Sequence, residues 1–393
     1  MVNALSAGLL LWLLASAAQA APLELQKAFI VHFTSTSAIA ETGTAEMILG
    51  EPRSFGLILQ AMQSGQTRFF GPVRRLRYGG RIVNVEPYAG PAGLKIRWFK
   101  VEPEMYHVDG RGHDPANPNF LWYANAGAPG GRTDRQPLAP DTIRYVQNAW
   151  AKGDDAWKIF ADAHPTDPNY DVNDGLGTMT FAATLQSDLG VSLETPTLKT
   201  YKTSDRLPLL LARVIVRENH SYTGYLTGYF NVPGVFGSYE AQVLQHIGVD
   251  CADLVVGARR EFARKTIPFT NVTGLRTRFQ SRYLTLVAGD VWLSSNGRIY
   301  RHYDARRGVL TNEAKIEAQI GDVIVFNYST DAKRPQWDHV GVLYQRATTS
   351  KILSGHDRLI HAGPAEAHVD RLAGEKFVVP SQPTRIAVLR WRS

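Results

Sequence analysis

Cys251 is the only cysteine in this chain of 393 residues, and it directly follows Asp250 at the start of a predicted helix. One cysteine cannot form an intramolecular disulfide, so Cys251 is either a small apolar side chain in a core or a chemically used thiol. Helix starts carry free N–H groups and partial positive charge, which lower the pKa of a thiol and favour the thiolate. We therefore expect Cys251 to be reactive, with core packing as the alternative.

Two histidines lie downstream in predicted strands. His339 begins the stretch HVGVLYQ at residues 339–345, and His361 lies in RLIHAGP at residues 358–364. A papain-like cysteine hydrolase needs this order, because the helix that carries the thiol packs on a sheet that carries the imidazole. A lone histidine in a strand is often structural, but three such elements in this order favour the catalytic interpretation.

The apolar pattern indicates which elements position these side chains. Apolar residues follow the helical period on one face of a helix that begins at the cysteine: Cys251, Leu254, Val255, Ala258 and Phe262. Asp250 stands at the N-cap and Asp253 three residues later, close to a capping box. Strands are expected in GDVIVFNY (321–328), in the two histidine segments and in RIAVLRWR (385–392).

The last part of the chain resembles the NlpC-type cell-wall endopeptidases, which are papain-like cysteine hydrolases. The resemblance rests on four segments in order: DCADLV (250–255), GDVIVF (321–326), HVGVLY (339–344) and IHA (360–362). It covers residues 239–393 at most and does not extend to residues 22–215. It implies a helix bearing the cysteine on an antiparallel sheet, with no metal and no cofactor.

The resemblance also implies roles for individual residues. Cys251 would be the nucleophile, His339 the general base and acid, and His361 the residue that orients His339. Tyr239, twelve residues before the cysteine, would help to hold the oxyanion, although the Trp-Gly-Gly that follows it in the family is missing.

The family's Ser-Gly after the cysteine is Ala252-Asp253 here, so Asp250 and Asp253 are candidate substrate-binding residues. A longer segment than in the family separates the two histidines. Asp338, His356 and His368 therefore compete with His361 for the orienting role.

The first part of the chain predicts a different architecture. Short runs rich in Val, Ile, Phe and Tyr alternate with Gly and Pro over residues 21–130, as in an antiparallel sandwich or barrel. The clearest hairpin has Gly79-Gly80 at its tip. Residues 131–215 predict a helix at 141–164 and two strands, at 178–186 and 209–218, which belong either to the first sandwich or to a second one.

Composition and the first residues indicate the compartment. Residues 1–20 have an apolar run followed by Ala18-Gln19-Ala20, which is typical of a signal peptide, with an uncleaved anchor as the alternative. The formal net charge of +7 suits anionic polymers such as a cell wall. Zinc-binding motifs, a P-loop and nucleic-acid motifs are all missing from the sequence.

These observations together predict an α+β protein with a signal peptide (1–20), a β-rich front (21–130 and 131–215) and a papain-like domain (216–393). We expect a secreted or periplasmic, monomeric cysteine hydrolase of amide bonds in peptidoglycan or related envelope peptides. Nucleic acid is not expected as a partner. The alternatives are a papain-like acyltransferase or amidase with another substrate, and a wall-binding protein whose hydrolase domain is inactive.

Overall fold

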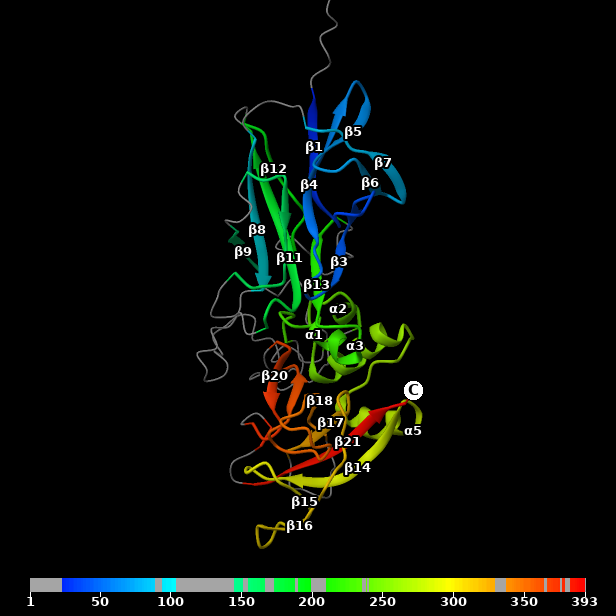
Figure 1. The fold of residues 1–393 in the computed structure, drawn as a ribbon, viewed down its shortest axis with the longest axis vertical. Helices are drawn as coiled ribbons and strands as arrows, with labels where there is room; N and C mark the ends of the chain where they lie inside the picture. Colours follow the sequence, from blue (N-terminus) through cyan, green and yellow to red (C-terminus); the bar gives the residue numbers. More distant parts are fainter. Residues whose placement is uncertain are drawn as a thin grey trace, which may run out of the picture.

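The computed structural model describes residues 23–88, 94–103, 145–150, 155–166, 173–187, 190–198, 210–234, 238, 240–328, 337–363, 366–374, 377–378 and 382–392. In these ranges the protein is rich in strands with few helices, and its sheets are mainly antiparallel, as expected for an α+β protein. The predicted signal peptide lies outside the described residues. In Figure 1 the β-rich front, the short helices and the C-terminal sheet follow one another along the long axis.

Two sheets pack face to face in the front part and form a β-sandwich. Their inner faces share one core, in which the rings of Phe55 and Phe181 lie 5.4 Å apart. Among the strands that the structure describes in these two sheets, all pairs are antiparallel except β3 with β13. The first sheet has the order β10-β4-β1-β2, with β5 beside β4: β1 Glu24–Phe33, β2 Glu41–Thr42, β4 Ser54–Gln63, β5 Gln66–Phe70 and β10 Lys158–Phe160. The second has the order β3-β13-β11-β8-β9, with β12 beside β11: β3 Thr44–Ile48, β8 Lys95–Pro103, β9 Tyr145–Ala149, β11 Gly177–Gln186, β12 Ser192–Glu194 and β13 Ala212–Arg217.

The helix predicted at residues 141–164 is wrong. In its described residues β9 pairs with β8, and β10 pairs with β4. Ile159, Ala161 and Ala163 are buried at every second position, which is the period of a strand. Pairing with strands already present in the two sheets overrides the local helical pattern.

The strands β11 and β13 complete the first sandwich. β11 pairs with β8 on one side and with β13 on the other. The segments 21–130 and 131–215 therefore contribute to the same sheets, which is the first of the two alternatives predicted for these strands.

The predicted hairpin is confirmed as the two-stranded sheet of β6 (Arg75–Tyr78) and β7 (Arg81–Asn84). Gly79 and Gly80 at its tip have φ values of 56° and 78°. Such a two-residue turn requires positive φ at both positions, which glycine adopts at the lowest cost.

The C-terminal part is built on an eight-stranded sheet. The strands predicted in 321–328, 339–345, 358–364 and 385–392 are confirmed as β17, β18, β19 and β21, whereas four further strands were not predicted. The sheet has the order β16-β15-β14-β21-β17-β18-β19-β20: β14 Leu284–Leu293, β15 Ile299–Asp304, β16 Val309–Glu313, β17 Val323–Asn327, β18 His339–Gln345, β19 Arg358–His361, β20 His368–Arg371 and β21 Thr384–Trp391.

Short helices lie between the sandwich and this sheet (Figure 1), and the longest of them, α3, contacts β18 and β19. None of the helices in the described ranges is long and apolar enough to cross a membrane. The helical segments are α1 Tyr222–Thr227, α2 Glu240–Leu244, α3 Cys251–Ala263, α4 Val272–Gly274, the π-helical turn η6 Leu275–Phe279 and α5 Gln280–Arg282.

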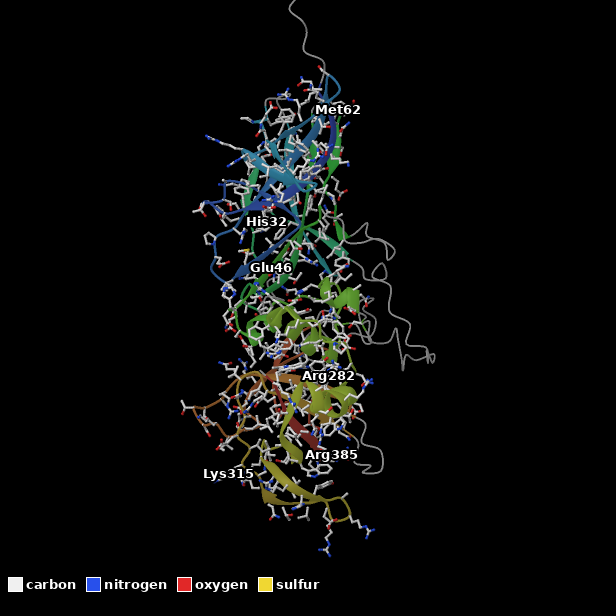
Figure 2. All side chains as sticks on the ribbon, turned by 90° about the vertical axis from the view of Figure 1, so that its right-hand side faces the viewer. His32, Glu46, Met62, Arg282, Lys315 and Arg385 are labelled. Carbon is white, nitrogen blue, oxygen red and sulfur yellow. The ribbon has the colours of Figure 1, made fainter. Side chains whose placement is uncertain are left out.

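One hydrophobic core joins the sandwich, the helices and one face of the C-terminal sheet. A second core covers the other face of that sheet and includes Phe326, Leu343 and Phe377. Figure 2 places His32 and Glu46 in the sandwich, Arg282 in the helical layer, and Lys315 and Arg385 in the C-terminal part.

Buried polar contacts also cross from the sandwich to the helical layer. The Thr178 hydroxyl donates to the Gly228 carbonyl at 2.7 Å and lies 3.0 Å from Nδ1 of His246. Nε2 of His246 lies 3.0 Å from the Glu261 carboxylate, which also accepts a hydrogen bond from the Tyr229 hydroxyl at 2.7 Å. The two parts of the chain are therefore joined by specific contacts as well as by apolar packing.

Candidate active site

The helix α3 begins at Cys251, as predicted. Asp250 is its N-cap, with extended backbone and a carboxylate that accepts a hydrogen bond from the Asp253 N–H at 2.8 Å. The Asp253 carboxylate accepts a hydrogen bond from the Ser238 hydroxyl at 2.7 Å, and the same hydroxyl oxygen accepts from the Asp250 N–H at 3.0 Å. Both aspartates, predicted as substrate-binding residues, thus fix the helix start.

The Cys251 side chain is largely buried, with 8% of its surface exposed. Burial raises the pKa of the Cys251 thiol well above its ordinary value, and the carboxylates of Asp250 and Asp253 raise it further. Hydrogen bonds from the backbone N–H groups of Val340 and Ala252 lower this pKa, but by less. The thiolate expected from the helix start is therefore not favoured. Desolvation and the nearby negative charge of the cap outweigh the helix dipole.

His339 lies at the start of β18, which packs against α3. Its neighbour Val340 shares the first core with Cys251. The His339 ring instead lies 5.6 Å from the ring of Phe377 and 6.1 Å from that of Phe326, two members of the second core. Successive residues of a strand point to opposite faces. This alternation places the His339 ring on the second-core face of β18, whereas Cys251 of α3 packs on the first-core face.

His361 is the predicted orienting residue, and it contacts His339. Nε2 of His339 and Nδ1 of His361 are 3.0 Å apart. His361 is fully buried, and burial, together with the nearby His368, lowers its pKa well below the ordinary value. A neutral imidazole in this position can fix the orientation of the His339 ring through one hydrogen bond.

The chain of contacts continues to β20. The Asp370 carboxylate lies 3.3 Å from Nε2 of His361 and 3.1 Å from Nε2 of His368. Asp370 was missed in the sequence, which has no motif around it. The available signal was the pattern His-x-Asp at residues 368–370, because residues two apart in a strand share a face.

Two other competitors for the orienting role have contacts of a different kind. The Asp338 carboxylate accepts a hydrogen bond from the Tyr328 N–H at 2.9 Å, and His356 is exposed. Tyr239, the predicted oxyanion residue, lies outside the described residues.

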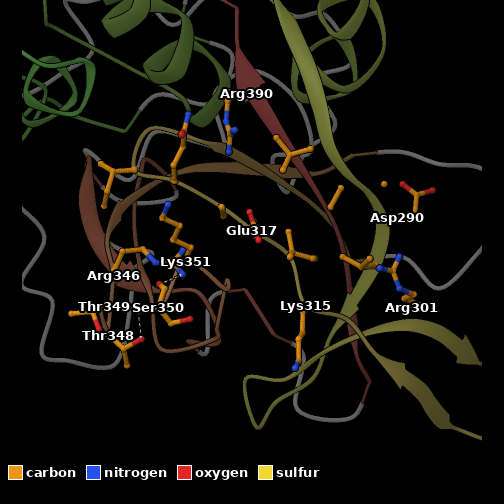
Figure 3. Close-up of a pocket in the computed structure, with 18 of the residues that line it drawn as sticks. Asp290, Arg301, Lys315, Glu317, Arg346, Thr348, Thr349, Ser350, Lys351 and Arg390 are labelled. Carbon is orange, nitrogen blue, oxygen red and sulfur yellow. Dashed lines mark hydrogen bonds between the residues drawn. The ribbon is translucent and has the colours of Figure 1, made fainter.

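A pocket lies on another part of the C-terminal sheet (Figure 3). Its labelled cations include Arg346, which pairs with Asp357, and Arg390, which forms two hydrogen bonds to Asp322. The lining residues include neither Cys251 nor the two histidines. We therefore assign the candidate chemistry to the start of α3 and not to this pocket.

Comparisons with models of known protein families, with curated proteins and with solved structures gave no match.

Proposed function

We propose that this protein is an exported cysteine hydrolase that cleaves amide bonds in peptidoglycan stem peptides or related envelope peptides. The observation that carries the proposal is the position of Cys251 at the start of a helix packed on β18, the strand that begins with His339. The hydrogen bond between His339 and His361 supports it. The proposal includes a papain-like arrangement of α3 on the sheet, which agrees with the resemblance to NlpC-type endopeptidases.

The reaction would be acyl transfer through a thioester. Burial keeps Cys251 in the thiol form. In the proposed step the His339 ring turns around the start of β18, from the second-core face toward the sulfur, and accepts the thiol proton as the sulfur attacks the amide carbonyl. The backbone N–H of Cys251 and Tyr239 hold the oxyanion. His339 then passes the proton to the departing amine, which leaves the acyl group on the sulfur.

Hydrolysis of the thioester completes the cycle. A water molecule gives a proton to His339 and adds to the thioester carbonyl. The carbon–sulfur bond breaks, the product leaves as a carboxylic acid, and His339 returns the proton to Cys251. His361 acts as a positioning residue, because it contacts His339 and not Cys251 in the described contacts.

The rest of the chain supports an envelope substrate. The signal-peptide pattern of residues 1–20 favours export, and the net charge of +7 favours contact with anionic wall polymers. The sandwich would position the substrate, since it presents loops on a rigid scaffold.

Digestion of purified muropeptides by the full-length protein, followed by mass spectrometry, tests the proposal. We expect new amine and carboxyl ends with the wild type, and no cleavage with Cys251→Ala or His339→Ala. His356→Ala is the matched control, because this exposed histidine lies in the same domain, and it should cleave at the wild-type rate. Equal cleavage by wild type and Cys251→Ala would rule out the thiol mechanism.

The burial of Cys251 favours one alternative, a wall-binding protein with an inactive hydrolase domain. Sedimentation with purified sacculi, measured beside the digestion, separates the two. Binding without cleavage by the wild type would support the binder, whereas cleavage that depends on Cys251 supports the enzyme.

A further inference from the structure

A cluster of three potential metal ligands lies at the edge of the C-terminal sheet. His361, His368 and Asp370 each offer one ligand atom, and these three atoms lie within 4.8 Å of one another. They come from the adjacent strands β19 and β20, in which His361 is paired with His368. The sequence predicted no metal site, because the spacing of these residues matches none of the common zinc motifs.

Two of the three ligand-atom separations are close to those of a tetrahedral site. Zinc binds histidine nitrogen and carboxylate oxygen at roughly 2.0–2.2 Å, so neighbouring ligand atoms in a tetrahedral site are about 3.3 Å apart. The Asp370 Oδ2 atom lies 3.3 Å from Nε2 of His361 and 3.1 Å from Nε2 of His368. All three ligand atoms lie within 4.8 Å of one another, so the two imidazoles would move closer together around a bound ion.

Hydrogen bonding around His368 turns its Nε2 toward the Asp370 carboxylate. Its Nδ1 lies 2.6 Å from the Glu366 carbonyl, which can only accept, so Nδ1–H is the donor. In the neutral ring Nε2 then carries a lone pair and faces the Asp370 carboxylate at 3.1 Å. A proton on Nε2 or a metal ion is needed to make this contact favourable.

The surroundings resemble those of bound metals in two further respects. A backbone carbonyl that accepts from the second ring nitrogen of a ligating histidine is a common second-shell contact. His361 is fully buried, whereas 13% of the His368 side chain and 32% of the Asp370 side chain are exposed, so an ion can enter from the Asp370 side.

We propose that His361, His368 and Asp370 form a binding site for one divalent transition-metal ion, with zinc as the ion to test. Two imidazoles and a carboxylate are a donor set that zinc accepts, and a fourth position remains for water or another ligand. Coordination through Nε2 of His361 leaves its Nδ1 facing His339. Occupancy therefore keeps the contact between the two rings, with Nδ1–H of His361 as the donor and Nε2 of His339 as the acceptor.

Isothermal titration calorimetry of the full-length, tag-free protein with Zn²⁺ tests the site. We expect one ion per chain in the wild type, and at least tenfold weaker binding in His368→Ala and in Asp370→Asn. Asp370→Asn keeps the shape of the side chain and weakens its ligand atom, which covers the case in which His368→Ala does not fold. His361 is left unchanged, because it belongs to the proposed catalytic machinery.

His356→Ala is the control and should bind Zn²⁺ as the wild type does, since this exposed histidine lies outside the cluster. Absence of saturable binding in the wild type would overturn the proposal. Unchanged affinity in folded His368→Ala and Asp370→Asn, checked by circular dichroism, would also overturn it. Neither result depends on hydrolase activity. The metal site can therefore be disproved while the proposed function stands, and the proposed function can be disproved while the metal site stands.

Discussion

At Cys251 two electrostatic effects oppose each other at a single side chain. The helix start offers N–H groups that stabilise a thiolate, but burial and the carboxylate of Asp250 raise the pKa of the thiol. Asp250 has two separable effects. Its oxygen caps the helix by accepting from the Asp253 N–H, and its charge disfavours ionisation of the thiol.

Replacing Asp250 separates these effects. Asp250→Asn keeps a capping oxygen and removes the charge, so the pKa of Cys251 should fall and iodoacetamide should label the folded protein faster at neutral pH. Iodoacetamide should also label Cys251 faster in the Asp250→Ala variant. The free energy of unfolding of this variant should drop by about 1 kcal/mol, because the cap is lost. Intact mass spectrometry and urea denaturation measure the two changes. Labelling of Asp250→Asn at the wild-type rate would contradict the assigned role of the charge.

His32 in the sandwich gives a prediction about pH. Burial, together with the charge of Arg53, lowers the pKa of His32 from 6.5 to about 4. The unfolded chain therefore takes up a proton below about pH 6.5 while the folded protein does not. The free energy of unfolding should fall as the pH drops from 6.5 to 4, by up to about 3 kcal/mol at about 1.4 kcal/mol per unit.

The variant His32→Gln has no such proton to bind and should show a flatter dependence of stability on pH over this window. Urea denaturation at pH 7, 6, 5 and 4 compares the two proteins. The same slope in both would show that His32 does not carry this effect.

At the scale of elements, the sequence predicts best those segments in which the period of the apolar residues matches the residues that the fold buries. The stripe from Cys251 to Ala258 is buried as expected, and the strands that carry His339 and His361 occur where alternation predicted them. Phe262, at the end of the same stripe, is instead 37% exposed.

Elements fixed by tertiary contacts escaped prediction. β10 forms through pairing with β4, and β20 through pairing with β19. Asp370 was missed for the same reason, because its importance comes from partners on another strand. A single sequence does not show which strands pair with one another, and so it does not show which side chains on them meet.

A buried ion pair connects two strands of the C-terminal sheet. Asp322, fully buried before β17, accepts from Nε and Nη2 of Arg390 in β21 at 2.7 and 2.8 Å. Arg390→Met should cost about 3 kcal/mol, because it leaves a buried carboxylate without its cation. Asp322→Asn should cost less, about 1–2 kcal/mol, since the Arg390 side chain is 37% exposed and can reach water. Denaturant unfolding of both variants measures the order, and the reverse order would contradict this explanation.

At the scale of the whole molecule, the sandwich and the C-terminal part share one core and a set of buried polar contacts. Gly177 in β11 has a φ of 112°, and a Cβ atom there would lie 2.3 Å from the Phe230 carbonyl oxygen of the helical layer. The two parts thus approach closely at a position that only glycine fits. The boundary at residue 216 separates two patterns of sequence but not two cores.

The fragment of residues 216–393 should therefore fail to fold by itself. It would expose the apolar surface that packs on β11 and β13 and would leave His246 without its Thr178 contact. We expect no cooperative thermal transition by circular dichroism and rapid proteolysis, in contrast to the full-length protein. A cooperative transition close to that of the full chain would show that the domains are independent.

The central claim is that Cys251 forms a thioester with an envelope peptide, and trapping that intermediate tests it most directly. Full-length protein mixed with a stem peptide that carries an activated ester at the scissile carbonyl is quenched in acid and analysed by peptide mass spectrometry. We predict an acyl adduct on Cys251 in the wild type, much slower formation of that adduct in His339→Ala, and none in Cys251→Ala. Release of the peptide product at the wild-type rate by Cys251→Ala would contradict the account.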